Sequence, residues 1–112
     1  MMNHVVQQQV LDRTFSALAD PTRRDILVRL GAGPASISAL AEPIGITLTG
    51  LKKHVQVLED AQLVATEKIG RTRVCRLGPN QLEDAVQWMD VYRNLWARRL
   101  DGLEAYIEKK KR

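Results

Sequence analysis

The sequence predicts a mainly α-helical fold with one small β-hairpin, and three features of the chain support this prediction. Apolar residues recur at helical spacing along most of the 112 residues. Two imperfectly alternating stretches, 63–68 and 71–77, surround Ile69-Gly70 and indicate a hairpin. Capping and breaking residues divide the remaining chain into short helices and a long final one. At this length we expect residues 1–112 to form one domain.

Local signals mark the first three helices. Apolar residues at three- and four-residue spacing predict a first helix that ends near Ala19. Asp20 is the expected N-cap of a second helix, because Pro21 follows it at the first helical position. Ser36 is the expected N-cap of a third helix. Pro43 keeps that helix short, because proline lacks a backbone donor and disfavours helical geometry in the residue before it.

Residues 36–61 have the pattern of a helix-turn-helix. Gly45 suits the turn because glycine adopts positive φ at no steric cost, and Thr47 is the expected cap of the helix that follows. One face of that helix is predicted to be buried and carries Leu48, Leu51, Val55 and Leu58. The other face carries Thr49, Lys52, Lys53 and Gln56. Such a helix presents its polar face to the major groove of DNA, so the pattern favours a DNA-binding protein.

A long helix is expected from Gln81 onward. Its apolar stripe, which Arg93 interrupts, consists of Leu82, Val86, Met89, Trp96, Leu100, Leu103 and Ile107. Three aromatic residues also recur one turn apart, namely Trp88, Tyr92 and Trp96. They could form the core of a dimer or line a pocket for an unknown small-molecule inducer. We favour the dimer core, because such interfaces are enriched in buried aromatic residues.

Composition narrows the function without deciding it. The formal net charge of +4 and the pI near 9.6 favour an anionic partner, but a basic balance alone is only an argument about solubility and steering. Cys75 is the single cysteine, so an intramolecular disulfide is excluded. We expect no membrane partner, because no stretch approaches the ~18 apolar residues of a membrane span. The N-terminus lacks the pattern of a signal peptide, so a cytoplasmic protein is expected.

The chain resembles the ArsR/SmtB family of winged helix-turn-helix repressors over nearly its whole length. The residues that carry the resemblance are Ala17-Leu18-Ala19-Asp20-Pro21-Thr22-Arg23-Arg24, Leu40-Ala41-Glu42-Pro43, Lys53-His54-Val55-Gln56-Val57-Leu58-Glu59 and Gly70-Arg71-Thr72-Arg73. Family members often carry glycine where Gln62 lies. Gln62 must therefore adopt a left-handed conformation or end the helix differently.

The resemblance implies a homodimer that binds double-stranded DNA and represses its own operon. It implies dimerisation through residues 1–19 and 80–110, recognition helices in successive major grooves, and wings formed by residues 63–77. The candidate dimer residues are Val10, Phe15, Val86, Met89, Trp96, Leu100 and Leu103. The candidate DNA-contacting residues are Thr47, Leu48, Thr49, Lys52, Lys53, His54 and Gln56 in the helix, and Lys68, Arg71 and Arg73 in the wing.

Individual roles can be assigned within the DNA-contacting set. We expect Thr49, Lys52 and Gln56 to read bases, with glutamine suited to adenine, and Lys53 to contact a phosphate. His54 could donate to a phosphate or serve as a half-buried structural residue, with equal weight. Basic residues of the wing could enter a minor groove or clamp phosphates, and the alternative is ordinary charge at a strand edge.

Other basic residues and the lone cysteine leave alternatives. Arg23 and Arg24 could contact phosphates or form ion pairs with Asp25 or Glu59. Cys75 on the second hairpin strand is expected to act as a small buried hydrophobe rather than as a redox sensor.

Other classes of function find little support in the sequence. Residues 37–44 contain no cysteine and the last helix contains no histidine, so we expect no metal site of the kind that family members use. No cofactor is expected, and no arrangement of catalytic residues indicates an enzyme. The main alternative is a protein-interaction module with a vestigial helix-turn-helix.

Overall fold

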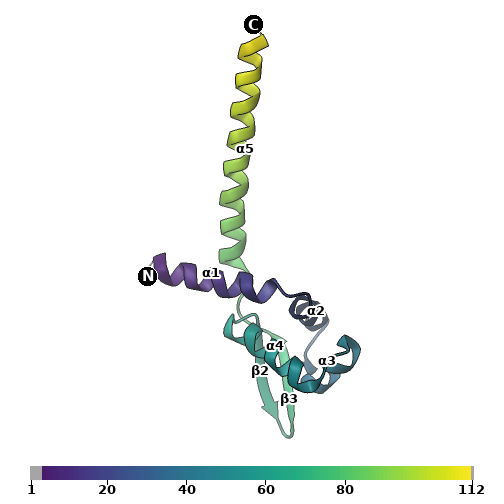
Figure 1. Ribbon diagram of the computed structural model, residues 1–112. Helices are drawn as coiled ribbons and strands as arrows, with labels where there is room; N and C mark the ends of the chain where they lie inside the picture. The colour runs from purple at the N-terminus through teal and green to yellow at the C-terminus, as the bar shows by residue number, and fades with distance from the viewer. Residues whose placement is uncertain (1–3, 112) are drawn as a thin grey trace. The chain divides into compact units, whose positions relative to one another are not determined.

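The computed structural model describes residues 4–111, with side chains described for residues 8–110. The elements in chain order are α1 (His4–Leu18), α2 (Pro21–Leu30), β1 (Ala35–Ser36), α3 (Ile37–Ile44), α4 (Leu48–Asp60), β2 (Val64–Ile69), β3 (Thr72–Leu77) and α5 (Glu83–Lys111), as Figure 1 shows. Internal contacts divide the chain into two compact units, one ending at Leu82 and one beginning at Glu83. The predicted class, mainly helical with a small antiparallel sheet, is confirmed.

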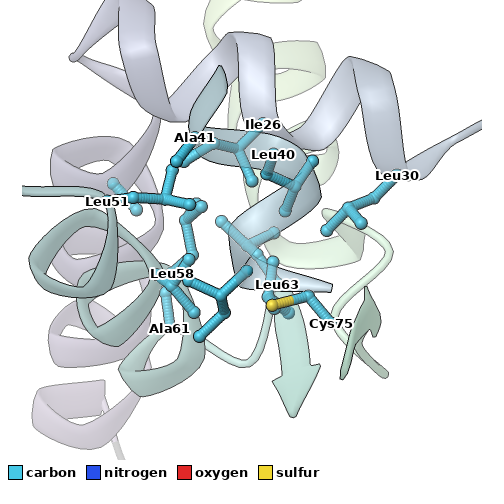
Figure 2. Close-up of a cluster of buried hydrophobic side chains, with 13 residues drawn as sticks. Ile26, Leu30, Leu40, Ala41, Leu51, Leu58, Ala61, Leu63 and Cys75 are labelled. Carbon is cyan, nitrogen blue, oxygen red and sulfur yellow. The ribbon is translucent and has the colours of Figure 1, made fainter. Parts of the chain in front are cut away.

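The core of the first unit lies where α2, α3 and α4 meet the inner ends of β2 and β3. Figure 2 shows side chains from all of these elements converging on one apolar cluster, whose fully buried members include Ile26, Leu51, Leu58, Val64 and Cys75. Burial of such side chains stabilises a fold by about 1.5–3 kcal/mol each before entropy is counted. The cluster therefore holds the helix-turn-helix and the base of the hairpin together as one body.

The predicted N-caps are confirmed by their hydrogen bonds. The Asp20 carboxylate accepts from the backbone N–H groups of Thr22, at 2.8 Å, and of Arg23, at 3.2 Å. The Ser36 hydroxyl accepts from the backbone N–H of Ala39 at 3.1 Å and caps α3. Gly45 ends α3 with φ 81°, in the left-handed conformation that the turn requires. The backbone turn before α4 is thus determined by local chemistry.

The sheet contains a short strand that the sequence pattern did not reveal. β1 pairs antiparallel with β3, with Ala35 opposite Cys75 and Ser36 opposite Val74, and the strand order is β1-β3-β2. Two residues are too few to show an alternating pattern, so only the tertiary pairing defines this strand. β1 joins the start of α3 directly to the wing.

The hairpin is confirmed, but its tip differs by one residue from the expected Ile69-Gly70. Ile69 pairs with Thr72, so Gly70 and Arg71 form the turn. Gly70 has φ 63°. A two-residue turn of this kind needs a left-handed first residue, which glycine supplies. Arg71 therefore lies at the tip itself.

Gln62 adopts the left-handed conformation, with φ 60°. Its backbone N–H donates to the carbonyl of Glu59 at 2.9 Å, and the N–H of Leu63 donates to Leu58 at 2.9 Å, which closes the end of α4. The chain then passes close to Gly78, where a Cβ atom would meet the Gln62 carbonyl. Only glycine allows that approach, so the end of α4 and the end of β3 lie in contact.

The long helix begins at Glu83, two residues later than predicted. The Asn80 side-chain oxygen accepts from the backbone N–H of Leu82 at 2.8 Å, and Leu82 has φ 67°, which is incompatible with a helical residue. Leu82 packs against the core of the first unit rather than extending the stripe of α5. From Glu83, α5 continues for 29 residues without a break at Gly102.

Candidate nucleic-acid interface

α4 presents a polar face opposite a buried one. The Thr47 hydroxyl caps the helix by accepting from the backbone N–H of Gly50 at 3.1 Å. Leu51, Val55 and Leu58 are buried, as the stripe predicted. The polar side chains of Thr49, Lys52, Lys53 and Gln56 are exposed. The helix therefore has the amphipathic arrangement that a recognition helix needs.

Leu48 does not belong to the buried stripe to which the sequence analysis assigned it. Its side chain is 43% exposed at the first position of α4. The first turn of a helix often lies at the edge of a core, where an apolar residue in register can still project beyond the packed elements. The exposed position is compatible with the separate expectation that Leu48 contacts DNA, where an apolar side chain can meet the methyl group of thymine.

Gln56 has a partner within α4. Its amide nitrogen donates to the Asp60 carboxylate at 2.9 Å, an i,i+4 hydrogen bond on the exposed face. A bidentate contact with adenine uses both the oxygen and the nitrogen of a glutamine amide. Base reading by Gln56 would therefore exchange the bond with Asp60 for one with DNA.

His54 and Arg23 are joined between α4 and the start of α2. Nδ1 of His54 lies 3.3 Å from Nη1 of Arg23, and the histidine side chain is 26% exposed. Arg23 also donates to the carbonyls of Ala17 and Ser16, each at 2.9 Å, and approaches Asp20 at 3.9 Å. The half-buried, structural interpretation of His54 fits this geometry.

The ion pairs expected for Arg23 and Arg24 differ from those observed. Arg23 pairs with Asp20 rather than with Asp25 or Glu59, and Asp25 is paired with Arg29 at 3.1 Å. Arg24 donates to the Leu18 carbonyl at 2.7 Å. Both arginines close the turn between α1 and α2, where helix C-terminal carbonyls lack intrahelical donors. The backbone N–H of Arg23 is the main cause that lowers the pKa of Asp20.

The wing carries its predicted basic residues in exposed positions. Lys68 lies directly opposite Arg73 in the register, and Arg71 is at the tip. Arg76 pairs diagonally with Glu67 at 3.5 Å, since Glu67 is opposite Val74 and Arg76 is opposite Ala65. The three predicted cations therefore surround the outer half of the wing.

A groove lies between α4 and the wing, and sequence reasoning missed two of its members. It has a volume of about 340 Å³ and is lined by Ile37, Lys52, Val55, Gln56, Glu59, Thr66 and Arg73. The Thr66 hydroxyl donates to the Glu59 carboxylate at 3.0 Å and accepts from Nη1 of Arg73 at 2.8 Å. Glu59 and Thr66 were overlooked because their pairing depends on tertiary contact. The alternation that aligns Thr66 with buried Val64 was the available signal.

Asn80 is a second residue whose role the sequence did not indicate. Its side-chain nitrogen donates to the carbonyl of Ala61, at 2.9 Å, and to the hydroxyl of Thr14, at 3.1 Å. Thr14 is only 3% exposed on α1, and Ala61 follows the last residue of α4. One amide thus connects α1, the end of α4 and, through Leu82, the approach to α5.

Cys75 lies on β3, as predicted, and is fully buried. Burial is the main cause that raises the pKa of its thiol, and the negative charge of Glu59 acts in the same direction. A raised pKa disfavours the thiolate that oxidation requires. Within the described part of the chain, no group of three or more His, Cys, Asp or Glu side chains is placed to hold a metal ion.

The candidate dimer residues lie on α1 and α5. Val10 is partly buried, and exposed apolar side chains are found at Phe15, Val86, Met89, Trp96, Leu100 and Leu103. Trp88 stacks on Tyr92 with ring centroids 5.6 Å apart, and Trp96 meets Tyr92 edge-on at 6.2 Å. Beside them, Tyr92, Leu95, Trp96 and Arg99 line an open depression of about 480 Å³. Nearly half of each of the three aromatic side chains is exposed.

None of the helices within residues 4–111 combines the length and the apolar character needed to cross a membrane. The helix-turn-helix with its basic exposed face and the adjoining β-hairpin define the class of winged helix-turn-helix proteins. A family model described as a helix-turn-helix domain matches residues 18–67.

Known proteins place the chain within that class. The HTH-type transcriptional regulator Rv2034 of Mycobacterium tuberculosis is 35% identical over 97 residues, which cover 87% of this chain and 88% of that protein. The transcriptional repressor SdpR of Bacillus subtilis is 29% identical over 79 residues, covering 70% of this chain and 88% of that protein. The solved structure of an ArsR-like transcriptional regulator from Rhodococcus sp. RHA1 matches with a TM-score of 0.80 and 30% identity, over 96% of this chain and 98% of that one.

The chain belongs to the ArsR family of DNA-binding transcriptional regulators. The resemblance found in the sequence is therefore confirmed.

Proposed function

We propose that this regulator is a homodimeric, sequence-specific repressor of its own operon. The observation that carries the proposal is the exposed face of α4, where Thr49, Lys53 and Gln56 project from a helix whose opposite face is anchored in the core. Thr49 and Gln56 read bases, and Lys53 contacts a phosphate. Repression also agrees with the function named for SdpR.

The dimer in this proposal forms through α1 and α5. Exposed apolar residues on α5 recur at intervals of three, seven, four and three residues, namely Val86, Met89, Trp96, Leu100 and Leu103. This spacing is that of a helix that packs along a second helix. A two-fold axis would present two α4 helices to successive major grooves, and a palindromic operator is then expected. Both units of the chain act together in this proposal as one winged helix-turn-helix domain.

The same proposal assigns the remaining features. The aromatic residues Trp88, Tyr92 and Trp96 belong to the dimer core, and an inducer site is the competing assignment for the depression beside them. The proposal assigns no catalytic activity to the protein, and it assigns the protein to the cytoplasm.

Fluorescence anisotropy tests the proposal directly. The probe is a labelled duplex from upstream of the chain's own gene, and the control is a scrambled duplex of equal length at the same salt concentration. We expect binding to the upstream duplex at least about a thousandfold tighter than to the scrambled one. Equal, weak binding to both would contradict autoregulation and favour the protein-interaction module.

A further inference from the structure

The inner face of the wing turns toward α4. Successive side chains of a strand alternate between faces, so Thr66 shares a face with buried Val64, and Arg73 shares one with buried Cys75. Thr66 and Cys75 are also opposite each other in the register. Thr66 and Arg73 therefore continue the core face outward, along the side that borders α4.

Glu59, Thr66 and Arg73 form a chain of hydrogen bonds across this border. The single proton of the Thr66 hydroxyl is donated to Glu59 at 3.0 Å, and its oxygen accepts from Arg73 at 2.8 Å. The hydroxyl thus links a residue on the last turn of the recognition helix to a cation on the second strand of the wing. Within the described residues, this bond uses only one of the several N–H donors of the guanidinium.

Two cationic side chains face the groove between α4 and the wing, which these hydrogen bonds border. Lys52 approaches from α4 and Arg73 from β3, while the only carboxylate in the lining, Glu59, is engaged by Thr66. Lys68 lies directly opposite Arg73 in the hairpin. Like charges at directly opposed positions destabilise a strand pair, and a bound anion would reverse that effect. The arrangement therefore favours an anionic ligand.

The geometry of DNA indicates which anion would lie in the groove, namely a backbone phosphate. A sugar-phosphate strand forms the ridge between the major and the minor groove. A recognition helix in the major groove and a wing beside the minor groove must therefore have that strand between them. The groove between α4 and the wing is the space available for it.

We propose that this groove is a binding site for one backbone phosphate of DNA, the phosphate site, with Lys52 and Arg73 as its ligands. Glu59 and Thr66 are positioning residues for Arg73. The proposal rests on the proposed DNA-binding function and deepens it. It moves Lys52 from base reading to phosphate binding, and it places Arg73 on the ridge between the grooves rather than in the minor groove. The guanidinium is pre-ordered by Thr66, so less entropy is lost when the phosphate binds.

The first test uses operator duplexes in which one phosphate at a time is replaced by an uncharged methylphosphonate. For the wild type we expect one position in each half-site at which neutralisation weakens binding about tenfold or more. For Arg73→Gln and Lys52→Gln, the same neutralisation should cost much less, because the partner of that charge has been removed. Arg76→Gln is the matched control, since Arg76 pairs with Glu67 and does not line the groove.

The second test separates positioning from contact. Thr66→Val keeps the shape of the side chain and removes the hydroxyl, so we expect weaker binding to operator and random duplexes alike. In an Arg73→Gln background, Thr66→Val should have no further effect, and Thr66→Ser should retain wild-type binding. Circular dichroism checks the fold of each variant. If Thr66→Val does not fold, the methylphosphonate scan with Arg73→Gln still decides the proposal.

Three results would overturn the proposal of a phosphate site. The first is a scan in which Arg73→Gln and Arg76→Gln show the same profile as the wild type. The second is an additive effect of Thr66→Val and Arg73→Gln. The third is a relaxed base preference in Lys52→Gln with the phosphate profile unchanged, which would return Lys52 to base reading. A wild type that fails to prefer its operator would instead contradict the proposed function. The scan on random duplex would still test the phosphate site.

Discussion

Arg23 holds together residues from α1, α2 and α4. Its guanidinium donates to two carbonyls at the end of α1 and lies beside Nδ1 of His54 on α4. Arginine can only donate, so this contact is a hydrogen bond when Nδ1 of His54 accepts. The family motif Asp20-Pro21-Thr22-Arg23 thus includes an arginine clamp, a set of contacts from Arg23 that connects α2 to α1 and α4.

We expect Arg23→Lys to lower the free energy of unfolding by about 1–3 kcal/mol, because an ammonium group cannot reproduce the forked contacts with Ala17, Ser16 and His54. Urea unfolding monitored by circular dichroism measures the change. Arg24→Lys is the control, since within the described residues the Arg24 side chain makes one hydrogen bond, to the Leu18 carbonyl, from an exposed position. Equal losses in both variants would show that the clamp adds nothing to stability.

The carboxyl group of Asp20 makes the stability of the fold depend on pH, and the direction of that dependence follows from its pKa. The backbone N–H of Arg23 is the main cause that lowers the pKa of this carboxyl in the folded state. A lowered pKa stabilises the fold above the ordinary pKa of aspartate, and that contribution is lost as the pH falls through the lowered value.

We therefore expect Asp20→Asn, which keeps an acceptor for the cap, to reduce the stability difference between neutral and acidic solution. Urea titrations of wild type and variant across that range provide the measurement. A variant with the same acid sensitivity as the wild type would show that other carboxylates dominate.

At the scale of elements, the proposed function gives the exposed residues of α4 different roles. We expect Gln56→Ala to relax sequence preference at one base pair, at a cost of about 1–3 kcal/mol on the preferred operator and little on random DNA. We expect Lys53→Ala to weaken binding to all duplexes similarly and to lower the slope of log affinity against log salt by about one.

Anisotropy titrations over a salt series, on operator and random duplexes, measure both effects. The Gln56 variant also loses the bond to Asp60, so its circular dichroism spectrum and stability serve as the control for helix integrity. Identical losses on both duplexes for both variants would contradict this division of roles.

The elements themselves were predictable where the chemistry is local. Capping by Asp20, Ser36 and Thr47 depends on a side chain and a backbone N–H a few residues later, so the sequence is sufficient to locate helix starts. β1 was not predicted because it is defined by its pairing with Val74 and Cys75, and the delayed start of α5 was not predicted because Leu82 packs against the core of the first unit.

The candidate site, too, was predictable only where it depends on local sequence. The exposed basic face of α4 follows from helical periodicity, whereas the contact of Thr66 with Glu59 needs the packed hairpin.

At the scale of the whole molecule, α5 carries apolar side chains that one chain alone leaves exposed. Trp96 lies on the stripe with Met89 and Leu100, and about half of each side chain is accessible. We expect Trp96→Ala to raise the dimer dissociation constant by about thirtyfold or more, because truncation of a central interface tryptophan costs ~2 kcal/mol or more. Multi-angle light scattering over a dilution series measures the change.

Val91→Ala is the matched control, since Val91 is also exposed on α5 but lies off the stripe. If the dimer survives dilution in Trp96→Ala as well as in Val91→Ala, Trp96 does not belong to the interface. The depression that it lines with Tyr92, Leu95 and Arg99 would then be the first place to test for an inducer.

The hydrogen bonds of Asn80 imply a thermodynamic linkage between two binding events. One amide is bonded both to Ala61, at the end of the helix proposed to read DNA, and to Leu82, directly before the helix proposed to dimerise. If DNA binding favours one position of Ala61, it also favours one conformation of the segment that leads into α5. Free-energy coupling is reciprocal, so the operator would tighten the dimer by the same factor by which dimerisation tightens operator binding. A regulator built in this way would respond to its own concentration more steeply than a preformed dimer would.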